Sequence, residues 1–452
     1  MESIERVSPK QGYRDILRLM LPCLAELLLG QLVSMVDMIM VGNIGTQAIN
    51  AVGICGNPTM LLMMIFAALN VGTTALISRA KGEGNIHKAN QVARLALLVN
   101  LLAGLAMLGL GLIFNNAMID MMGAPDAQTA ALAAQYLRMR VLGMPFIAVT
   151  AANNAILRGM GNARTPMIYN LTANGVNVLF NWLLINGIWF FPQMGVVGAA
   201  LATTLSNLAS TVISCAILLR GHSDIHIRLK EKYGLDKNML SNLFRIGAPS
   251  MAEQIVMRIG LIICGRLTIS LGAVDYAAHQ LCWNILNILF CCGSAMQMAI
   301  SPLTGQCLGR KSVKDAEDYA KYGVHLLLLT MTLCGLLCIF LGRPLLMLYS
   351  PEDNVLAAAI PLMRLFGIFL PSMAFQYVHG GVLAGAGDTK YNAAFFIISA
   401  VIARIPLLLL FKDVFHWGLM GVNLSFMADV LLRWVLFSGR FYMGKWKTVK
   451  LK

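Results

Sequence analysis

Charged residues are scarce in this sequence, and carboxylates are the scarcer kind. Only 12% of its 452 residues are charged, with 21 Asp and Glu among them, whereas soluble domains have about 25% charged residues. Apolar runs of about 20 residues, enough to cross roughly 30 Å of hydrocarbon, recur along the chain and exclude an ordinary soluble fold. The sequence therefore predicts an all-α integral membrane protein with twelve transmembrane helices, near 16–41, 51–77, 90–114, 130–157, 166–190, 196–219, 241–270, 277–306, 317–341, 357–383, 391–411 and 417–438.

The sequence also lacks the motifs of common enzymes. It has no nucleotide-binding glycine loop followed by Lys-Ser/Thr and no linked nucleophile and base. The ten cysteines are scattered through apolar segments without nearby histidines, which excludes a recognisable zinc site or disulfide framework. We therefore expect no enzyme activity, no cofactor and no structural metal. A cleavable signal peptide is not visible either, so we expect the first apolar run to be retained.

The net charge of +14 is explained by membrane topology. Basic residues gather in alternate connections, while the intervening connections hold only Arg343 and Lys412. By the positive-inside rule both termini are cytoplasmic, which requires an even number of spans. We expect a multi-pass protein of the plasma (inner) membrane in contact with lipid, monomeric, and without a nucleic-acid partner.

An internal repeat divides the chain into two halves. A shift of 227 residues takes Pro22 and Glu26 to Pro249 and Glu253, and a shift of 226 takes 157–162 to 383–388. Six predicted spans separate the copies, so both have the same orientation, related by a pseudo-twofold axis along the membrane normal. We expect an amino-terminal six-helix lobe at 1–219, a cytoplasmic linker at 220–240, and a carboxy-terminal six-helix lobe with a basic tail at 241–452, facing each other across a central cleft.

The ordered motifs of the chain resemble those of the multidrug and toxic compound extrusion (MATE) family. The resemblance runs from about residue 14 to 440 and is nearer to the DinF-like than to the NorM-like branch. It implies a V-shaped antiporter that exports organic drugs or metabolites, often cationic and amphipathic. Family members carry an acidic coupling residue fifteen positions after a proline of helix 1, and Pro22 and Asp37 match that spacing. The other motifs are 37–42, 72–74, 79–84, 157–161, 195–200, 385–390 and 404–407.

Four carboxylates lie clearly within predicted spans, away from the span ends: Glu26, Asp37, Glu253 and Asp429. A charged group in hydrocarbon costs about 2.5–3.5 kcal/mol on insertion scales, so it normally faces a cavity or a partner. Glu26 and Asp37 are eleven residues apart, which places them on nearly one helical face about 16 Å apart. Ser34 lies between them on that face. The pattern predicts a polar seam that lines the cleft.

The roles of these carboxylates have alternatives. Asp37 is interpreted as a group that binds a proton or a sodium ion in competition with substrate. The alternative is that Asp37 forms a structural ion pair or is a helix-end carboxylate in water. Glu26 would line the substrate cleft, or else lie in a water-filled cytoplasmic mouth without any transport role. Glu253 matches a membrane-embedded glutamate of NorM-like and eukaryotic members, or it pairs with Arg258 or Arg266.

Asparagines form a second seam in the span at 166–190. They recur at i, i+4, i+7 and i+11, close to one helical face that must turn inward in lipid. One interpretation is hydrogen bonding between helices, about 0.6 kcal/mol per contact. The seam consists of Asn170, Asn174, Asn177 and Asn181.

The family resemblance gives this seam a sharper interpretation. It implies that Asn177 and Asn181 surround the aspartate of helix 1, and that Asn153 or Asn154 together with Thr203 completes an ion site. Some DinF-like members carry a second aspartate at the position of Asn181. The single carboxylate of this chain leaves both the coupling ion, H⁺ or Na⁺, and the stoichiometry open.

The second half does not copy the first. Cys264 occupies the repeat position of Asp37, and Met373 stands where NorM-like members carry an aspartate. His379 and Gln376 lie one turn apart on one face and are predicted to line the substrate cleft. His379 could take up a proton near neutral pH, or it is a hydrogen-bonded core histidine.

We therefore expect a secondary active antiporter in which the ion at Asp37 and the substrate favour opposite cleft orientations. The alternative is a flippase for a lipid-linked or amphipathic precursor in the same superfamily, which would need a basic cleft. The residues that keep this alternative open are Arg138, Arg140, Arg258, Arg364 and Arg404.

Overall fold

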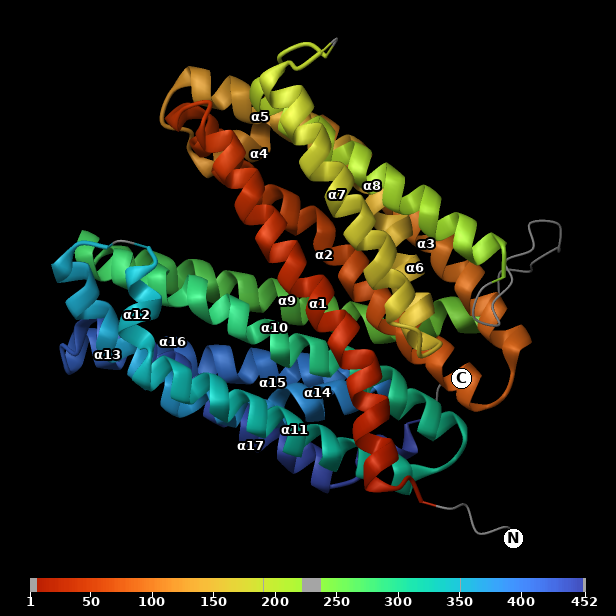
Figure 1. Ribbon diagram of the computed structural model, residues 1–452. Helices are drawn as coiled ribbons and strands as arrows, with labels where there is room; N and C mark the ends of the chain where they lie inside the picture. Colours follow the sequence, from red (N-terminus) through yellow and green to blue (C-terminus); the bar gives the residue numbers. More distant parts are fainter. Residues whose placement is uncertain (1–5, 190, 222–236, 350, 450–452) are drawn as a thin grey trace, which may run out of the picture. The chain divides into compact units, whose positions relative to one another are not determined.

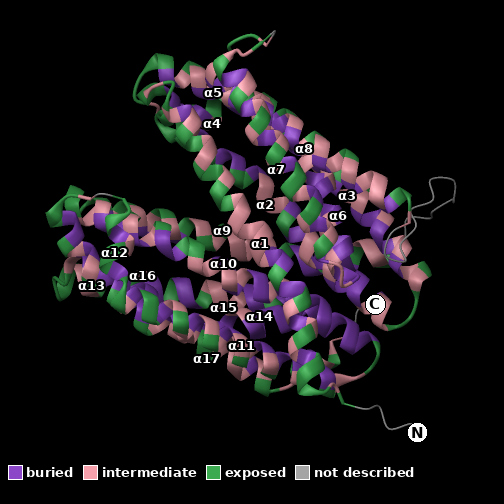
Figure 2. Ribbon diagram, viewed as in Figure 1, coloured by how far each residue is buried: buried purple, intermediate pink, exposed green. Residues whose placement is uncertain are grey.

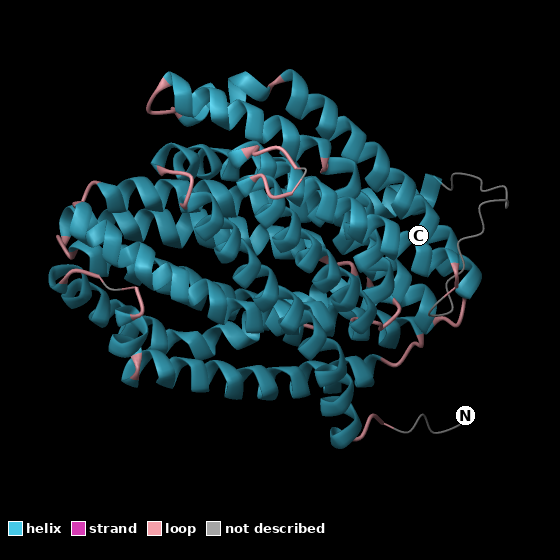
Figure 3. Cartoon of the chain, turned by 45° about the horizontal axis from the view of Figure 1, so that its top comes forward, coloured by secondary structure: helices cyan, strands magenta, loops and turns pink. Residues whose placement is uncertain are grey.

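The computed structural model describes residues 6–189, 191–221, 237–349 and 351–449, and within these ranges the chain forms helices and no β-strand (Figure 3). Most of the predicted linker at 220–240 lies outside the described residues. Contacts divide the chain into two compact units. Ala25–Gly247 form what we call the amino-terminal unit, and Ala248–Leu451 together with the chain up to Leu24 form the carboxy-terminal unit. The predicted lobe boundaries at 219 and 241 stay a prediction.

Among the described residues, the amino-terminal unit contains seven complete helices and the part of α1 from Ala25 onward (Figure 1). Small and apolar side chains such as Ala51, Phe66 and Leu137 fill a core shared by α2, α5 and their neighbours. The helices are α1 (Pro9–Gly42), α2 (Thr46–Gly82), α3 (Ile86–Ile113), α4 (Asn115–Met122), α5 (Ala127–Leu142), α6 (Met144–Gly159), α7 (Arg164–Asn186) and α8 (Gly195–Leu219).

The carboxy-terminal unit repeats this order with more interruptions, two of them π-helical (η3 and η4). A π-helical turn holds an extra residue and often marks a functional site. Its elements are α9 (Lys237–Ile269), α10 (Ala273–Gly309), α11 (Val313–Phe340), α12 (Gly342–Met347), α13 (Asp353–Phe369), η2 (Leu370–Ser372), α14 (Met373–Ala386), α15 (Thr389–Ile398), η3 (Ser399–Arg404), α16 (Ile405–Leu409), η4 (Leu410–Val414), α17 (Gly418–Tyr442) and η5 (Lys445–Thr448).

The first helix of each half belongs to both units. α1 passes from one unit to the other after Leu24, and α9 passes after Gly247. Each has a proline within three residues of that point, Pro22 and Pro249. Proline removes a backbone hydrogen bond and weakens the helix there, so both long helices change unit where their own hydrogen bonding is interrupted.

Contacts at the start of α1 and α9 show this exchange. Near the start of α1, Asp15 accepts a 2.7 Å hydrogen bond from the Tyr319 hydroxyl on α11. Near the start of α9, the backbone of Leu243 lies so close to Gly72 on α2 that a side chain at Gly72 would collide with it. Both segments are therefore packed against the unit that does not contain the rest of their helix.

Ten described helices, counting continuous stretches, are long and apolar enough to cross a membrane, and the pair α5–α6 would make an eleventh. The pair bends by 45°. The sequence predicted one span at 130–157 for it, and the bend is a feature that this prediction missed. The span predicted at 166–190 corresponds to α7, whose asparagines lower its hydropathy.

Several helices have exposed positions (Figure 2), and many of these positions hold large apolar side chains. On α3, Leu102 is 56% exposed, and on α11, Leu329 is 60% exposed and Leu333 is 55% exposed. Leucine faces of this kind match the hydrocarbon of a bilayer and would be unfavourable in water.

Candidate functional site

The amino-terminal unit brings together the predicted residues around Asp37. The half-buried Asp37 carboxylate of α1 accepts a 2.6 Å hydrogen bond from the amide of Asn181 on α7. Asn181 is fully buried, and its other amide atom, Oδ1, has no hydrogen-bond partner. The positive charge of Arg140 on α5 also acts on Asp37. An oxygen-rich, partly desolvated carboxylate site of this kind suits a proton or a hard monovalent cation.

Asn177 joins the same cluster from one turn earlier on α7. With its amide nitrogen turned toward α1, it donates a 2.9 Å hydrogen bond to Asp37 Oδ1. In the opposite orientation it donates to the Thr203 hydroxyl on α8 at 3.3 Å. Amide nitrogen and oxygen are assigned from such networks, and the carboxylate favours the first orientation. Three helices, α1, α7 and α8, thus bring Asp37, Asn177, Asn181 and Thr203 together, with Asn177 within hydrogen-bonding distance of both Asp37 and Thr203.

Glu26 lies in a second polar cluster on the same side of α1. Arg158 Nη2 on α6 contacts both carboxylate oxygens of Glu26, at 2.8 Å and 2.7 Å. Asn170 on α7 donates to the same carboxylate at 2.9 Å and accepts from the Ser210 hydroxyl at 3.0 Å. The sequence did not predict Arg158 as a partner, because this residue follows directly after the predicted span at 130–157 and was counted among the basic residues of a cytoplasmic connection.

Asn153 and Asn154 lie outside the Asp37 group. Asn153 is fully buried and donates to Ser214 on α8 at 2.8 Å. Asn154 accepts hydrogen bonds from Tyr169 and from Asn170, which connects it to the Glu26 cluster. Their predicted part in an ion site stays a prediction without a direct contact to Asp37 in this structure.

Ser34 does not bridge the two clusters. It is exposed, and its hydroxyl donates to the Gly30 carbonyl of its own helix at 3.0 Å. This hydrogen bond occupies the donor without fixing the side chain to another helix. The place of Ser34 in a substrate cleft stays a prediction.

The residues predicted in the second half lie in the carboxy-terminal unit. The charge that acts on Glu253 is that of Arg433 on α17. His379 on α14 is 2% exposed, hydrogen-bonds to Ser438 at 3.1 Å and stacks on Phe441 with ring centroids 4.4 Å apart. Gln376 is buried, and its Oε1 has no hydrogen-bond partner. Their predicted roles in the substrate cleft stay predictions.

Solved structures share this arrangement of helices. "Crystal structure of MATE in the bent conformation" matches with a TM-score of 0.89 and 23% identity, covering 97% of this chain and 96% of that chain. "Outward-facing conformation of a multidrug resistance MATE family transporter of the MOP superfamily" matches with a TM-score of 0.90 and 22% identity, covering 99% and 100%. The predicted all-α membrane fold is confirmed.

The family is shown by the sequence. The family model described as MatE matches residues 22–183 and 249–410, one match in each half. "Probable multidrug resistance protein NorM" of Thermotoga maritima is 25% identical over 441 residues, covering 96% of this chain and 93% of that protein. "Uncharacterized transporter YisQ" of Bacillus subtilis is 25% identical over 426 residues, covering 94% and 93%. The chain belongs to the MatE family of multidrug transporters, whose members are not enzymes.

Proposed function

We propose that the chain is a secondary active antiporter that exports organic compounds in exchange for protons or sodium ions, with Asp37 as the coupling carboxylate. The supporting observation is the 2.6 Å hydrogen bond between the half-buried Asp37 and the fully buried Asn181. Asn181 fixes the carboxylate, and nearby amide and hydroxyl oxygens are available for a cation. In this proposal the protein is a monomer in the inner membrane with both termini in the cytoplasm.

Coupling requires that ion and substrate prefer different conformations. A ligand shifts a conformational equilibrium only through its different affinity for the two states. Protonation of Asp37 removes its negative charge and a bound sodium ion offsets it, and either change weakens the hydrogen bond from Asn181. Packing between α1 and α7 then depends on whether the ion is bound, which gives the ion a preference for one state.

Transport in proteoliposomes tests the proposal. Ethidium or norfloxacin efflux is measured with purified protein under an imposed proton gradient and, separately, an imposed sodium gradient. Asp37→Asn keeps the size of the side chain but removes the charge, and we expect it to abolish gradient-driven efflux. Asp120→Asn is the matched control, because Asp120 is an exposed carboxylate on α4.

Gradient-driven efflux that survives undiminished in Asp37→Asn would exclude this residue as the coupling group. Efflux in the wild type that does not respond to either gradient would exclude antiport itself. Transfer of a lipid-linked precursor between leaflets, without drug export, would favour the flippase function.

A further inference from the structure

One cation of the amino-terminal unit acts on the Asp37 site without being paired to it. Arg140 lies in the last turn of α5, where it is half-buried, and its positive charge acts on the Asp37 carboxylate. Within the described residues its guanidinium forms neither an ion pair nor a hydrogen bond. The carboxylate accepts its 2.6 Å hydrogen bond from Asn181 instead. Opposite charges therefore lie near each other in one unit and leave each other unpaired.

The packing of four helices shows independently that Arg140 faces this site. An apolar cluster joins residues of α1, α7 and α8, and Tyr136 of α5 packs against it. Each of these residues lies four positions, about one helical turn, from a polar or charged residue on the same face of its helix. The polar residues therefore form a second layer next to the apolar one. The apolar and polar members are Val41 and Asp37, Ile185 and Asn181, Ala199 and Thr203, and Tyr136 and Arg140.

A hydrogen bond between α8 and α5 fixes the level of Arg140. The Thr204 hydroxyl donates to the backbone carbonyl of Met139 at 2.7 Å. Arg140 and Thr203 are the chain neighbours of these two residues, so they lie at the same level. Thr203 in turn lies 3.3 Å from the amide of Asn177. Arg140 is thus held at the level of the groups that surround Asp37.

The other titratable groups around the site carry no opposing charge. Among the described residues, Arg140 is the one charged group that acts on Asp37. Tyr136 faces Asp37 from one turn earlier on α5 as a neutral phenol. Cys55 of α2 donates its thiol hydrogen to the Ala133 carbonyl at 3.2 Å. The groups of α7 and α8 at this level are amides and a hydroxyl, so the charge of Arg140 acts on Asp37 alone.

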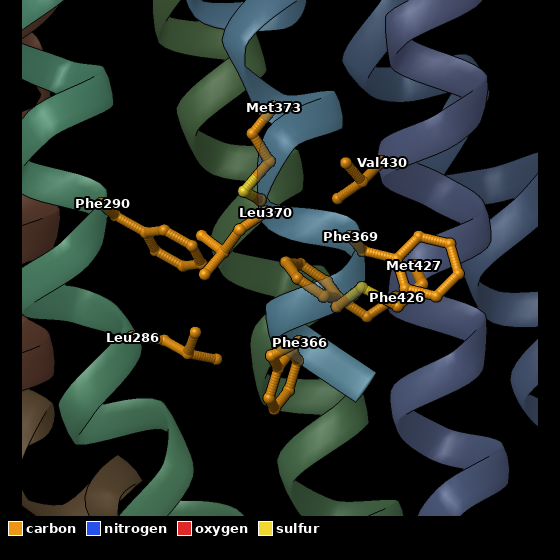
Figure 4. Close-up of a pocket in the computed structure, with 9 residues that line it drawn as sticks. All are labelled: Leu286, Phe290, Phe366, Phe369, Leu370, Met373, Phe426, Met427 and Val430. Atoms are coloured by element: carbon orange, nitrogen blue, oxygen red, sulfur yellow. The ribbon is translucent and has the colours of Figure 1, made fainter. Parts of the chain in front are cut away.

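The internal repeat loses both charges together. The shift of 227 residues takes Asp37 to Cys264, and the shift of 226 takes Arg140 to Phe366. The carboxy-terminal unit therefore has neither a carboxylate nor a guanidinium at these positions, and Phe366 lines an apolar pocket instead (Figure 4). Joint presence in one half and joint absence in the other indicate that the two charges act together. The pocket is lined by Leu286, Phe290, Phe366, Phe369, Leu370, Met373, Phe426, Met427 and Val430.

We propose that Arg140 sets the affinity of the Asp37 site for its coupling ion, as a cation fixed to the protein that competes with the ion for the carboxylate. A positive charge near a carboxylate opposes the binding of a second cation, whether a proton or sodium. The same charge partly neutralises Asp37 when no ion is bound, which lowers the cost of a carboxylate inside the membrane. Arg140 would therefore favour release of the ion. This inference rests on the proposed function, because it assigns a role within the same site.

Ion titrations of the purified full-length protein in detergent test the proposal. Tryptophan fluorescence is followed across pH without sodium, and against sodium chloride at fixed pH with choline chloride as the ionic-strength control. Trp182 is a suitable reporter because it follows Asn181 on α7. The response that disappears in Asp37→Asn belongs to the site. We expect Arg140→Gln to move its midpoint to an about tenfold lower ion concentration, and Arg140→Lys to stay within about twofold of the wild type.

Controls separate the charge of Arg140 from general effects. Arg138→Gln removes an exposed arginine of the same helix and should leave the midpoint unchanged. If Arg140→Gln does not give folded protein, Arg140→Met keeps an unbranched apolar stem and should give the same shift. A midpoint in the uncharged variants that stays within about twofold of the wild type overturns the proposal. An equal shift in Arg138→Gln also overturns it, because net charge would then be the cause.

Failure of this proposal is distinguishable from failure of the proposed function. Gradient-driven ethidium efflux that disappears in Asp37→Asn, combined with an unshifted midpoint in Arg140→Gln, would overturn only the role of Arg140. Wild-type efflux that responds to neither gradient would overturn the proposed function and the role of Arg140 with it.

Discussion

The ion pair between Glu26 and Arg158 should be the strongest single polar contact between α1 and the rest of the amino-terminal unit. One guanidinium nitrogen contacts both carboxylate oxygens at 2.8 Å and 2.7 Å, and both side chains are 15% exposed. Exposed ion pairs contribute about 0–1 kcal/mol, and breaking a fully buried pair costs about 3–5 kcal/mol. The partial burial of this pair places the expected cost of Arg158→Gln between these limits, at about 2–3 kcal/mol.

A double-mutant cycle isolates the pair, which matters because Arg158 also interacts with other groups. Glu26→Gln should cost less than Arg158→Gln, since the amide keeps a hydrogen-bond acceptor for Asn170 and leaves no buried negative charge. The double variant should cost less than the sum of the single changes by about 1–2 kcal/mol. The assay is reversible denaturation of the purified protein in detergent micelles, followed by tryptophan fluorescence.

An exposed pair serves as the matched control. Lys88 and Glu83 form a 3.0 Å salt bridge with side chains that are 40% and 34% exposed, and the same cycle there should give a coupling of less than about 1 kcal/mol. A coupling at Glu26–Arg158 that does not exceed this control would refute the reasoning from burial. Because folding and transport are measured separately, a loss of export in Glu26→Gln without loss of stability would support its predicted place in the substrate cleft.

Three further outcomes follow from packing and hydrogen bonding. Asn181→Ala removes the 2.6 Å donor to the coupling carboxylate, and gradient-driven ethidium export should fall at least about tenfold, whereas Asn174→Ala should change it little. Gly335→Ala would place a Cβ closer than van der Waals contact to a backbone carbonyl of α13, and it should lower the free energy of unfolding by about 1–3 kcal/mol. Gly265→Ala is the control, because Gly265 has open space around it, and it should not lower the free energy of unfolding. Trp446→Ala truncates a fully buried side chain near the carboxyl end and should cost about 3–5 kcal/mol in the same denaturation assay.

The number of membrane-spanning segments was predictable from the sequence, whereas the interruptions within these segments were not. Length and hydropathy identify apolar runs, and these do not distinguish a straight span from a bent one. The repeat pairs Pro145 with Pro371, and the structure interrupts both predicted spans close to these prolines, at Gly143 between α5 and α6 and at Leu370–Ser372 between α13 and α14. Proline at equivalent positions of the two halves was the signal for these breaks.

The asparagine face of α7 was predictable from its helical spacing, whereas the place of Asn177 and Asn181 around Asp37 was implied only by the family resemblance. Asn177 and Asn181 lie one turn apart on α7, so a contact from one to Asp37 brings the other close. The contact between Glu26 and Arg158 was not predictable in this way, because it depends on how α1 packs against α6. Arg404 was visible in the sequence as part of the motif at 404–407 and as a basic residue, whereas the π-helical turn η3 that contains it has no simple sequence pattern.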